Sequence, residues 1–94
     1  MLNEQQQEIL RISQEECAEV IQAISKVFRF GLNGTHPDRA QDNQEHLSEE
    51  IGDLIAMIEL LIRNDIIKEA DVMQARINKF KKLSKWSNID IPEV

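Results

Sequence analysis

The sequence predicts an all-α protein, from its composition and from two long amphipathic segments. Leu, Ile, Glu and Gln are plentiful, Tyr is absent and only 3 of the 94 residues are Gly, a balance that favours helices over sheet. Along both segments apolar residues recur at spacings of three and four, and no two-residue alternation persists. A chain this short builds one small core, so we expect a single domain over residues 1–94 that gains stability from a partner subunit.

Two long helices joined by a loop are predicted first. The first helix begins at Asn3, whose side chain can cap it while Gln6 reaches back as in a capping box, and it ends before Gly31. Turn-forming residues then collect over residues 31–43, which predicts a loop long enough to suggest a function. The second helix should begin at residue 42 or 43 and end around residue 64 or 65.

A third, shorter helix follows the second. Ala70, Met73, Ile77 and Phe80 recur at spacings of three and four, and the last turns of this helix are basic, which suits the negative end of a helix dipole. The pattern dissolves after Trp86, so we expect an extended tail over residues 86–94.

Four residues of types that often carry chemistry are assigned structural or surface roles. Cys17 is expected to be a buried small hydrophobe, because the acids beside it would raise a thiol pKa and oppose a nucleophile. His36 and His46 are expected to face solvent, and Trp86 to cover the core or an interface.

Charge and hydropathy exclude several function classes. A net charge of −6 opposes binding to nucleic acid, whose phosphates are held by Lys and Arg. The first residues have neither a basic region nor an apolar run, and no stretch is long and apolar enough to span a membrane. We therefore expect a cytoplasmic protein without a nucleic-acid or membrane partner.

Paired carboxylates are the chemically informative feature. Glu16 and Glu19 lie three residues apart in the first helix, and Glu50 and Asp53 lie three apart in the second. Residues at this spacing are neighbours on a helix surface, so each pair makes a clamp of two carboxylates. Antiparallel helices would bring the two clamps face to face.

Two of these acids fall within apolar arcs of their helices. Glu16 lies close to Ile9 and Ala23 on the helical wheel, and Glu50 lies beside Leu47. A carboxylate there is costly unless a cation compensates it, and oxygen ligands suit Mg²⁺, with Mn²⁺ as a substitute. The alternative is an ordinary solvated helical face, which is the usual explanation for Glu-rich helices.

Between the acids of the second helix, Gly52 is expected to allow close helix approach.

The order of these acids resembles a known family. Glu15, Glu16 and Glu19 followed on the next helix by Glu50 and Asp53 look like the signature of the MazG-like, all-α NTP pyrophosphohydrolases. The resemblance covers roughly residues 8–85. It implies a helical bundle of two long antiparallel helices plus a third, completed by oligomerisation into a four-helix core, as a homodimer or homotetramer.

The resemblance also implies an activity, that of a hydrolase acting on acid anhydrides. A nucleoside triphosphate, NTP or dNTP, would be hydrolysed between its α and β phosphates to a monophosphate and pyrophosphate. Glu16, Glu19, Glu50 and Asp53 would be the metal ligands, with Glu15 or one of the ligands orienting or deprotonating a water. Normal, modified and signalling nucleotides all fit this pattern.

Basic side chains are needed for the outer phosphates of such a substrate. The candidates lie near a helix end or on the third helix, which family members use for phosphate contact: Lys26, Arg29, Arg76, Lys79 and Lys82. The alternative for each is that it complements a helix dipole. The third helix does not closely match the pattern of Lys and Asn residues that family members with a clearer motif show there.

Other readings come from different classes. The first is a non-catalytic helical interaction module with an idle acidic metal site, and the second is an acidic surface that mimics DNA. A ferritin-like di-iron protein is excluded, because no Glu in the chain is followed by His at the third position.

Overall fold

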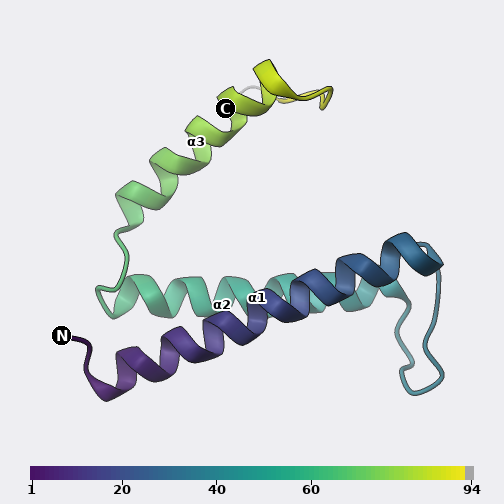
Figure 1. The fold of residues 1–94 in the computed structure, drawn as a ribbon, viewed down its shortest axis with the longest axis horizontal. Coiled ribbons are helices and arrows are strands. Elements are labelled where there is room, and N and C mark those ends of the chain that lie inside the picture. Colours follow the sequence, from purple (N-terminus) through teal and green to yellow (C-terminus); the bar gives the residue numbers. More distant parts are fainter. Residues whose placement is uncertain (93–94) are drawn as a thin grey trace.

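The computed structural model describes residues 1–92, which form three helices and no strand. Helix α1 spans Glu4–Phe30, α2 spans Asn43–Arg63 and α3 spans Glu69–Trp86. The predicted all-α class is therefore confirmed, and α1 and α2 run antiparallel along one another (Figure 1). Within the predicted tail, residues 87–92 are not helical, and residues 93–94 lie outside the described part of the chain.

Both long helices begin with a capping box, which the sequence analysis predicted for α1, whereas for α2 it predicted only a start at residue 42 or 43. The Asn3 side chain accepts a hydrogen bond from the Gln6 amide at 2.8 Å, and the Gln6 side chain accepts one from the Asn3 amide at 3.0 Å. Asp42 and Glu45 repeat this arrangement at the start of α2. By contrast, Lys68 precedes α3 and makes no side-chain cap. Caps satisfy amides that a helix start otherwise leaves open, so the start of α3 is the least secured.

Polar contacts pin together both ends of the α1–α2 hairpin. At one end Gln5 and Gln6 donate hydrogen bonds of 2.8 Å to the Asn64 side chain and carbonyl. At the loop end Asn43 is 3% exposed, and its side chain donates to the carbonyl of Gly31 at 3.0 Å and, more weakly, to that of Lys26 at 3.4 Å. These contacts set how far the two helices can slide along each other.

The core of a single chain is thin. Among the described residues only Ile9, Ala23 and Met57 are buried apolar side chains, and all three belong to the α1–α2 hairpin. The Cα radius of gyration is 16.2 Å, against about 12 Å for a compact chain of this length. Large apolar side chains are left exposed on the hairpin and on α3: Ile21, Ile24, Phe28, Ile51, Ile55, Met73 and Trp86.

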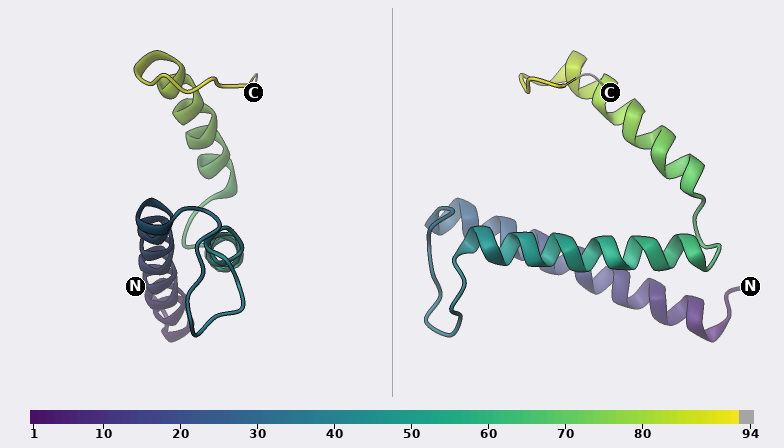
Figure 2. Two further views of the ribbon diagram at one scale, coloured as in Figure 1. Left: turned by 90° about the vertical axis from the view of Figure 1, so that its right-hand side faces the viewer. Right: turned by 180° about the vertical axis from the view of Figure 1, so that it is seen from behind.

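Helix α3 stands apart from the hairpin and has no buried residue. It leaves the end of α2 at an angle and does not run alongside α1 or α2 (Figures 1 and 2). None of the helices in the described residues is long and apolar enough to cross a membrane.

Two local expectations are wrong in this chain. Cys17 is exposed rather than buried, because it lies outside the narrow stripe of α1 that carries the buried residues Ile9, Ser13 and Ala23. A side chain at Gly52 would meet nothing within 4 Å, so this glycine does not serve close approach of the two helices. The glycine with close neighbours is instead Gly34 in the loop, where an added Cβ would lie 2.6 Å from the Phe30 carbonyl oxygen.

Candidate metal centre

Three carboxylates from the hairpin converge at the middle of the α1–α2 contact. Oxygen atoms of Glu16, Glu50 and Asp53 all lie within 4.8 Å of one another. Glu16 is on α1 and follows the buried Ser13 by one helical turn, whereas Glu50 and Asp53 are one turn apart on α2. The antiparallel pairing thus brings Glu16 of the first predicted clamp to both acids of the second, with Glu16 and Glu50 partly buried and Asp53 exposed.

The other two predicted acids are not part of this group. Glu15 and Glu19 are both exposed, and neither belongs to the group of carboxylates that lie within 4.8 Å of one another. Both are nevertheless close enough to Glu16 to act on it electrostatically. The structure therefore brings three of the four predicted ligands together and leaves the fourth at the rim.

The pKa of Glu16 is raised above its ordinary value of 4.5. Desolvation by burial is the largest cause, followed by repulsion from Asp53, then Glu50, Glu19 and Glu15. Both effects disfavour the ionised carboxylate. A cation among these oxygens would reverse the repulsion, which is the electrostatic behaviour expected of a site built for a metal ion.

His46 adjoins the cluster, one turn before Glu50. Its Nε2 lies 3.7 Å from Glu50 Oε1, and the side chains of His46 and Glu50 are only 15% and 12% exposed. The expectation that His46 faces solvent is therefore wrong, because the face of α2 that carries Glu50 also carries the residue four positions earlier. Its Nδ1 is buried without a hydrogen-bond partner among the described residues.

The donor set limits which metal the residues can hold. All three converging groups are carboxylates, and Cys17 lies exposed on another face of α1. Oxygen-only donors suit hard divalent cations such as Mg²⁺ and Mn²⁺ and do not suit soft, thiolate-preferring ions. The residues present therefore fit the predicted metal.

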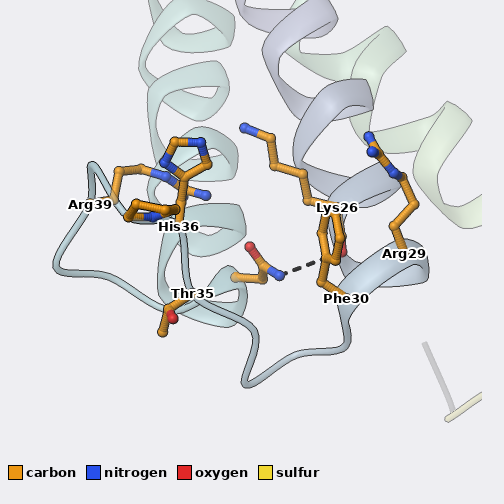
Figure 3. A pocket seen from close by; sticks show the side chains of 8 residues that line it. Lys26, Arg29, Phe30, Thr35, His36 and Arg39 are labelled. Atoms are coloured by element: carbon orange, nitrogen blue, oxygen red, sulfur yellow. Dashed lines mark hydrogen bonds between the residues drawn. The ribbon is translucent and has the colours of Figure 1, made fainter.

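A second feature, which we call the loop pocket, lies at the loop end of the hairpin. It is a cavity of about 380 Å³ between the end of α1 and the 31–42 loop, with Asn43 at the start of α2. Its remaining lining residues are Lys26, Arg29, Phe30, Thr35, His36, Pro37 and Arg39. In Figure 3, Lys26 extends from α1 while His36 and Arg39 approach from the loop on the other side.

The five predicted phosphate-contact residues divide between two regions. Lys26 and Arg29 both line the loop pocket, where Arg29 stacks on the Phe30 ring at 4.9 Å. The other three lie exposed on α3, away from the acids of the same chain (Figures 1 and 2): Arg76, Lys79 and Lys82.

Two neighbours of the predicted site residues were missed by sequence reasoning. His46 could have been found from its spacing, because it precedes Glu50 by four residues. Arg39 lies in a segment without periodicity, so no sequence signal places it opposite Lys26.

Comparison with known proteins agrees with this geometry. The family described as "MazG nucleotide pyrophosphohydrolase domain" matches residues 4–87, which include all three helices and the converging acids. Searches of curated proteins and of solved structures gave no match. Because the family match extends over nearly the whole chain, the protein belongs to the MazG nucleotide pyrophosphohydrolase domain family.

Proposed function

We propose that this protein hydrolyses nucleoside triphosphates between the α and β phosphates, yielding a nucleoside monophosphate and pyrophosphate in a reaction that depends on Mg²⁺. Membership of the family supports a nucleotide pyrophosphohydrolase. The observation that carries the proposal is the convergence of Glu16, Glu50 and Asp53 within 4.8 Å between two helices.

The proposed ligands are the two carboxylate pairs. Glu16, Glu50 and Asp53 hold the ion from the cluster, and Glu19 joins them by a change of side-chain rotamer, since it lies one turn after Glu16 on α1. When bound, Mg²⁺ supplies a water of lowered pKa and neutralises charge that develops on the leaving pyrophosphate. Mn²⁺, which has similar ligand preferences, substitutes for it.

The chain's own groups position the reactants. His46, whose Nε2 lies 3.7 Å from Glu50 Oε1, restricts the rotamers of that carboxylate. Glu15, exposed at the edge of the cluster, or one of the ligands orients or deprotonates the attacking water. Lys26 and Arg29 contact the outer phosphates from the loop end of the hairpin.

A second copy completes this site. Within one chain Arg76, Lys79 and Lys82 lie away from the acids, so α3 reaches a substrate only across a subunit interface. Exposed apolar side chains on both long helices, such as Phe28 at 87% and Ile21 at 67% exposure, favour the same conclusion. We propose a homodimer or homotetramer with a four-helix core.

The test is a product analysis with purified protein. A panel of canonical and modified NTPs and dNTPs is incubated with Mg²⁺, Mn²⁺ or EDTA, and the products are resolved to separate pyrophosphate from orthophosphate. Metal-dependent release of pyrophosphate with a monophosphate is expected. Release of orthophosphate from any substrate, or product formation in EDTA, would contradict the proposal.

A binding measurement separates the enzyme from an idle interaction module. A metal that binds the native state raises the unfolding temperature by mass action, whereas an unoccupied acidic surface shows little response. We expect Mg²⁺ to stabilise the wild-type protein and to stabilise Asp53→Asn much less. An equal response of both proteins, together with no turnover of any nucleotide, would favour the interaction module.

A further inference from the structure

We propose that the loop pocket is a binding site for phosphate oxyanions, in which Lys26, His36 and Arg39 hold the outer phosphates of the nucleotide. The identity of the ligand rests on the proposed function, whereas the preference for an anion rests on the pocket itself. Of the three residues, His36 and Arg39 come from the loop and lie outside the acidic motif.

The charge of the pocket is the first argument. Lys26, Arg29 and Arg39 line it, and among the described residues no carboxylate forms an ion pair with any of them. In a protein with a net charge of −6, three cations that share a cavity without acidic partners form a local field favourable to anions. Cations that only complemented a helix dipole could face solvent and would not need to line a cavity.

The Arg39 guanidinium supplies the second argument. Its Nη1 is buried and has no hydrogen-bond partner among the described residues. A buried donor of this kind is costly when left unpaired, and a planar guanidinium matches phosphate oxygens well. Figure 3 shows Arg39 reaching from the loop toward the Lys26 side of the pocket, and His36 lies beside it. A phosphate between these groups would satisfy the orphaned donor.

The loop is built to hold this arrangement. Gly34 lies against the Phe30 backbone and the Asn43 side chain, where a Cβ would come within 2.6–2.9 Å of three atoms. Its carbonyl accepts a 2.8 Å hydrogen bond from the Asn43 amide, and Thr35 and Asp42 pair in a single antiparallel bridge. The segment that carries His36 and Arg39 is therefore anchored on both sides.

The direction of the side chains connects the pocket to the acids. Lys26 follows Glu19 by seven residues, about 10 Å along α1 at the rise of an α-helix. Side chains lean toward the amino end of their helix, so Lys26 leans toward the acids while Glu50 and Asp53 on antiparallel α2 lean toward the loop. A phosphate chain held at the acids can thus extend toward Lys26 and Arg39.

The opposite side of the acids is unsuitable for phosphate. A cavity of about 510 Å³ there is lined by Ile9, Ile12, Met57 and Leu60 together with the acidic Glu4 and Glu8. Apolar walls and carboxylates disfavour an anion but accept an uncharged ring system. The outer phosphates therefore point toward the loop pocket and the nucleoside points away from it.

The test measures the binding of inorganic pyrophosphate directly, by titration calorimetry in EDTA at low ionic strength. Removal of metal leaves the acids repulsive, so the measured affinity reports on the loop pocket. We expect wild-type protein to bind pyrophosphate, and Arg39→Gln and Lys26→Gln to raise the dissociation constant about 10- to 100-fold. Arg39→Lys, which keeps the charge, should lose less.

Arg11→Gln is the matched control, because Arg11 is an exposed arginine of α1 that lines neither cavity. Unfolding temperatures of all variants are recorded to separate loss of binding from loss of folding. The proposal is overturned if wild-type protein fails to bind pyrophosphate, or if folded Arg39→Gln and Lys26→Gln bind it as Arg11→Gln does.

Turnover distinguishes this inference from the proposed function. If wild type releases pyrophosphate but Arg39→Gln keeps the wild-type KM, the proposed reaction is supported and the assignment of the loop pocket to the phosphates is wrong. If no nucleotide is hydrolysed but Arg39→Gln still weakens pyrophosphate binding, the anion site in the loop pocket is supported and the proposed reaction is wrong.

Discussion

The α1–α2 hairpin and α3 are both amphipathic, yet they are stabilised very differently. The hairpin has two capping boxes, a polar clamp at each end and every buried residue among those described, including Ile9 and Met57. Helix α3 has no side-chain cap and no buried residue. The difference teaches that the converging acids lie in the part of the chain that stabilises itself, whereas α3 gains little from contacts within its own chain.

The largest expected effect is on activity. Asp53→Asn in the hairpin should lower kcat/KM by at least about 100-fold, because it removes one charge from the proposed metal ligands. Asp71→Asn makes the same change in an exposed first-turn residue of α3 and should leave kcat/KM close to wild type. Steady-state assays of pyrophosphate release check both. Equal losses in the two variants would contradict the assignment of the site to the hairpin.

The next effect is on stability, through the Asn43 hydrogen bonds that join the two helices at the loop end. Asn43→Ala should reduce the free energy of unfolding by about 1–3 kcal/mol, since it leaves the carbonyls of Gly31 and Lys26 without their side-chain donor. Asn78→Ala in α3 removes only a surface contact with Gln74 and should change stability by less than about 0.5 kcal/mol. Denaturant unfolding at one protein concentration measures both. A larger loss for Asn78→Ala would overturn the comparison.

Helix starts should respond in opposite directions. Asp42→Ala removes a capping box and should cost about 1 kcal/mol, whereas Lys68→Asp adds a capping side chain where none exists and should stabilise α3 by roughly 0.5–1 kcal/mol. Circular dichroism during thermal unfolding detects both changes. No gain from Lys68→Asp would mean that the start of α3 is secured by contacts other than a cap.

The smallest effect is a pH dependence of metal-free protein. The raised pKa of Glu16 means that the native state holds this proton more tightly than the unfolded state does. Its contribution is therefore stabilising below the ordinary pKa of 4.5 and is lost as the pH rises through the raised pKa. In EDTA, Glu16→Gln should unfold at a higher temperature than wild type at pH 7, and the gap should close toward pH 4.5. A gap that stays constant with pH would argue against a raised pKa of Glu16 in the native state.

Much of the fold follows from local signals in the sequence. Asn3 with Gln6 indicated the start of α1, because capping depends on side chains three residues apart, and the start of α2 was predicted at residue 42 or 43. The i, i+3 spacing of the acids within apolar arcs indicated the metal site for the same local reason. The structure confirms the helices and brings together Glu16, Glu50 and Asp53, although their role as ligands stays a proposal.

The remaining features depend on contacts between distant residues. His46 was expected in solvent, but packing of α2 on α1 buries its side chain against Glu50. Cys17 was expected inside, but the thin interface of a two-helix hairpin leaves it outside. Helical periodicity tells which residues share a face, and it does not tell how much of that face a neighbour covers.

By itself, then, the sequence determined the helices, the capping box of α1, the loop between the long helices and the pairing of acids, since each depends on residues a few positions apart. Only the tertiary structure decided the register that brings Glu16 to Glu50, and the fold of the loop that sets Arg39 opposite Lys26. Both are long-range outcomes, because register and loop conformation are selected by packing and hydrogen bonds between segments that no local pattern encodes.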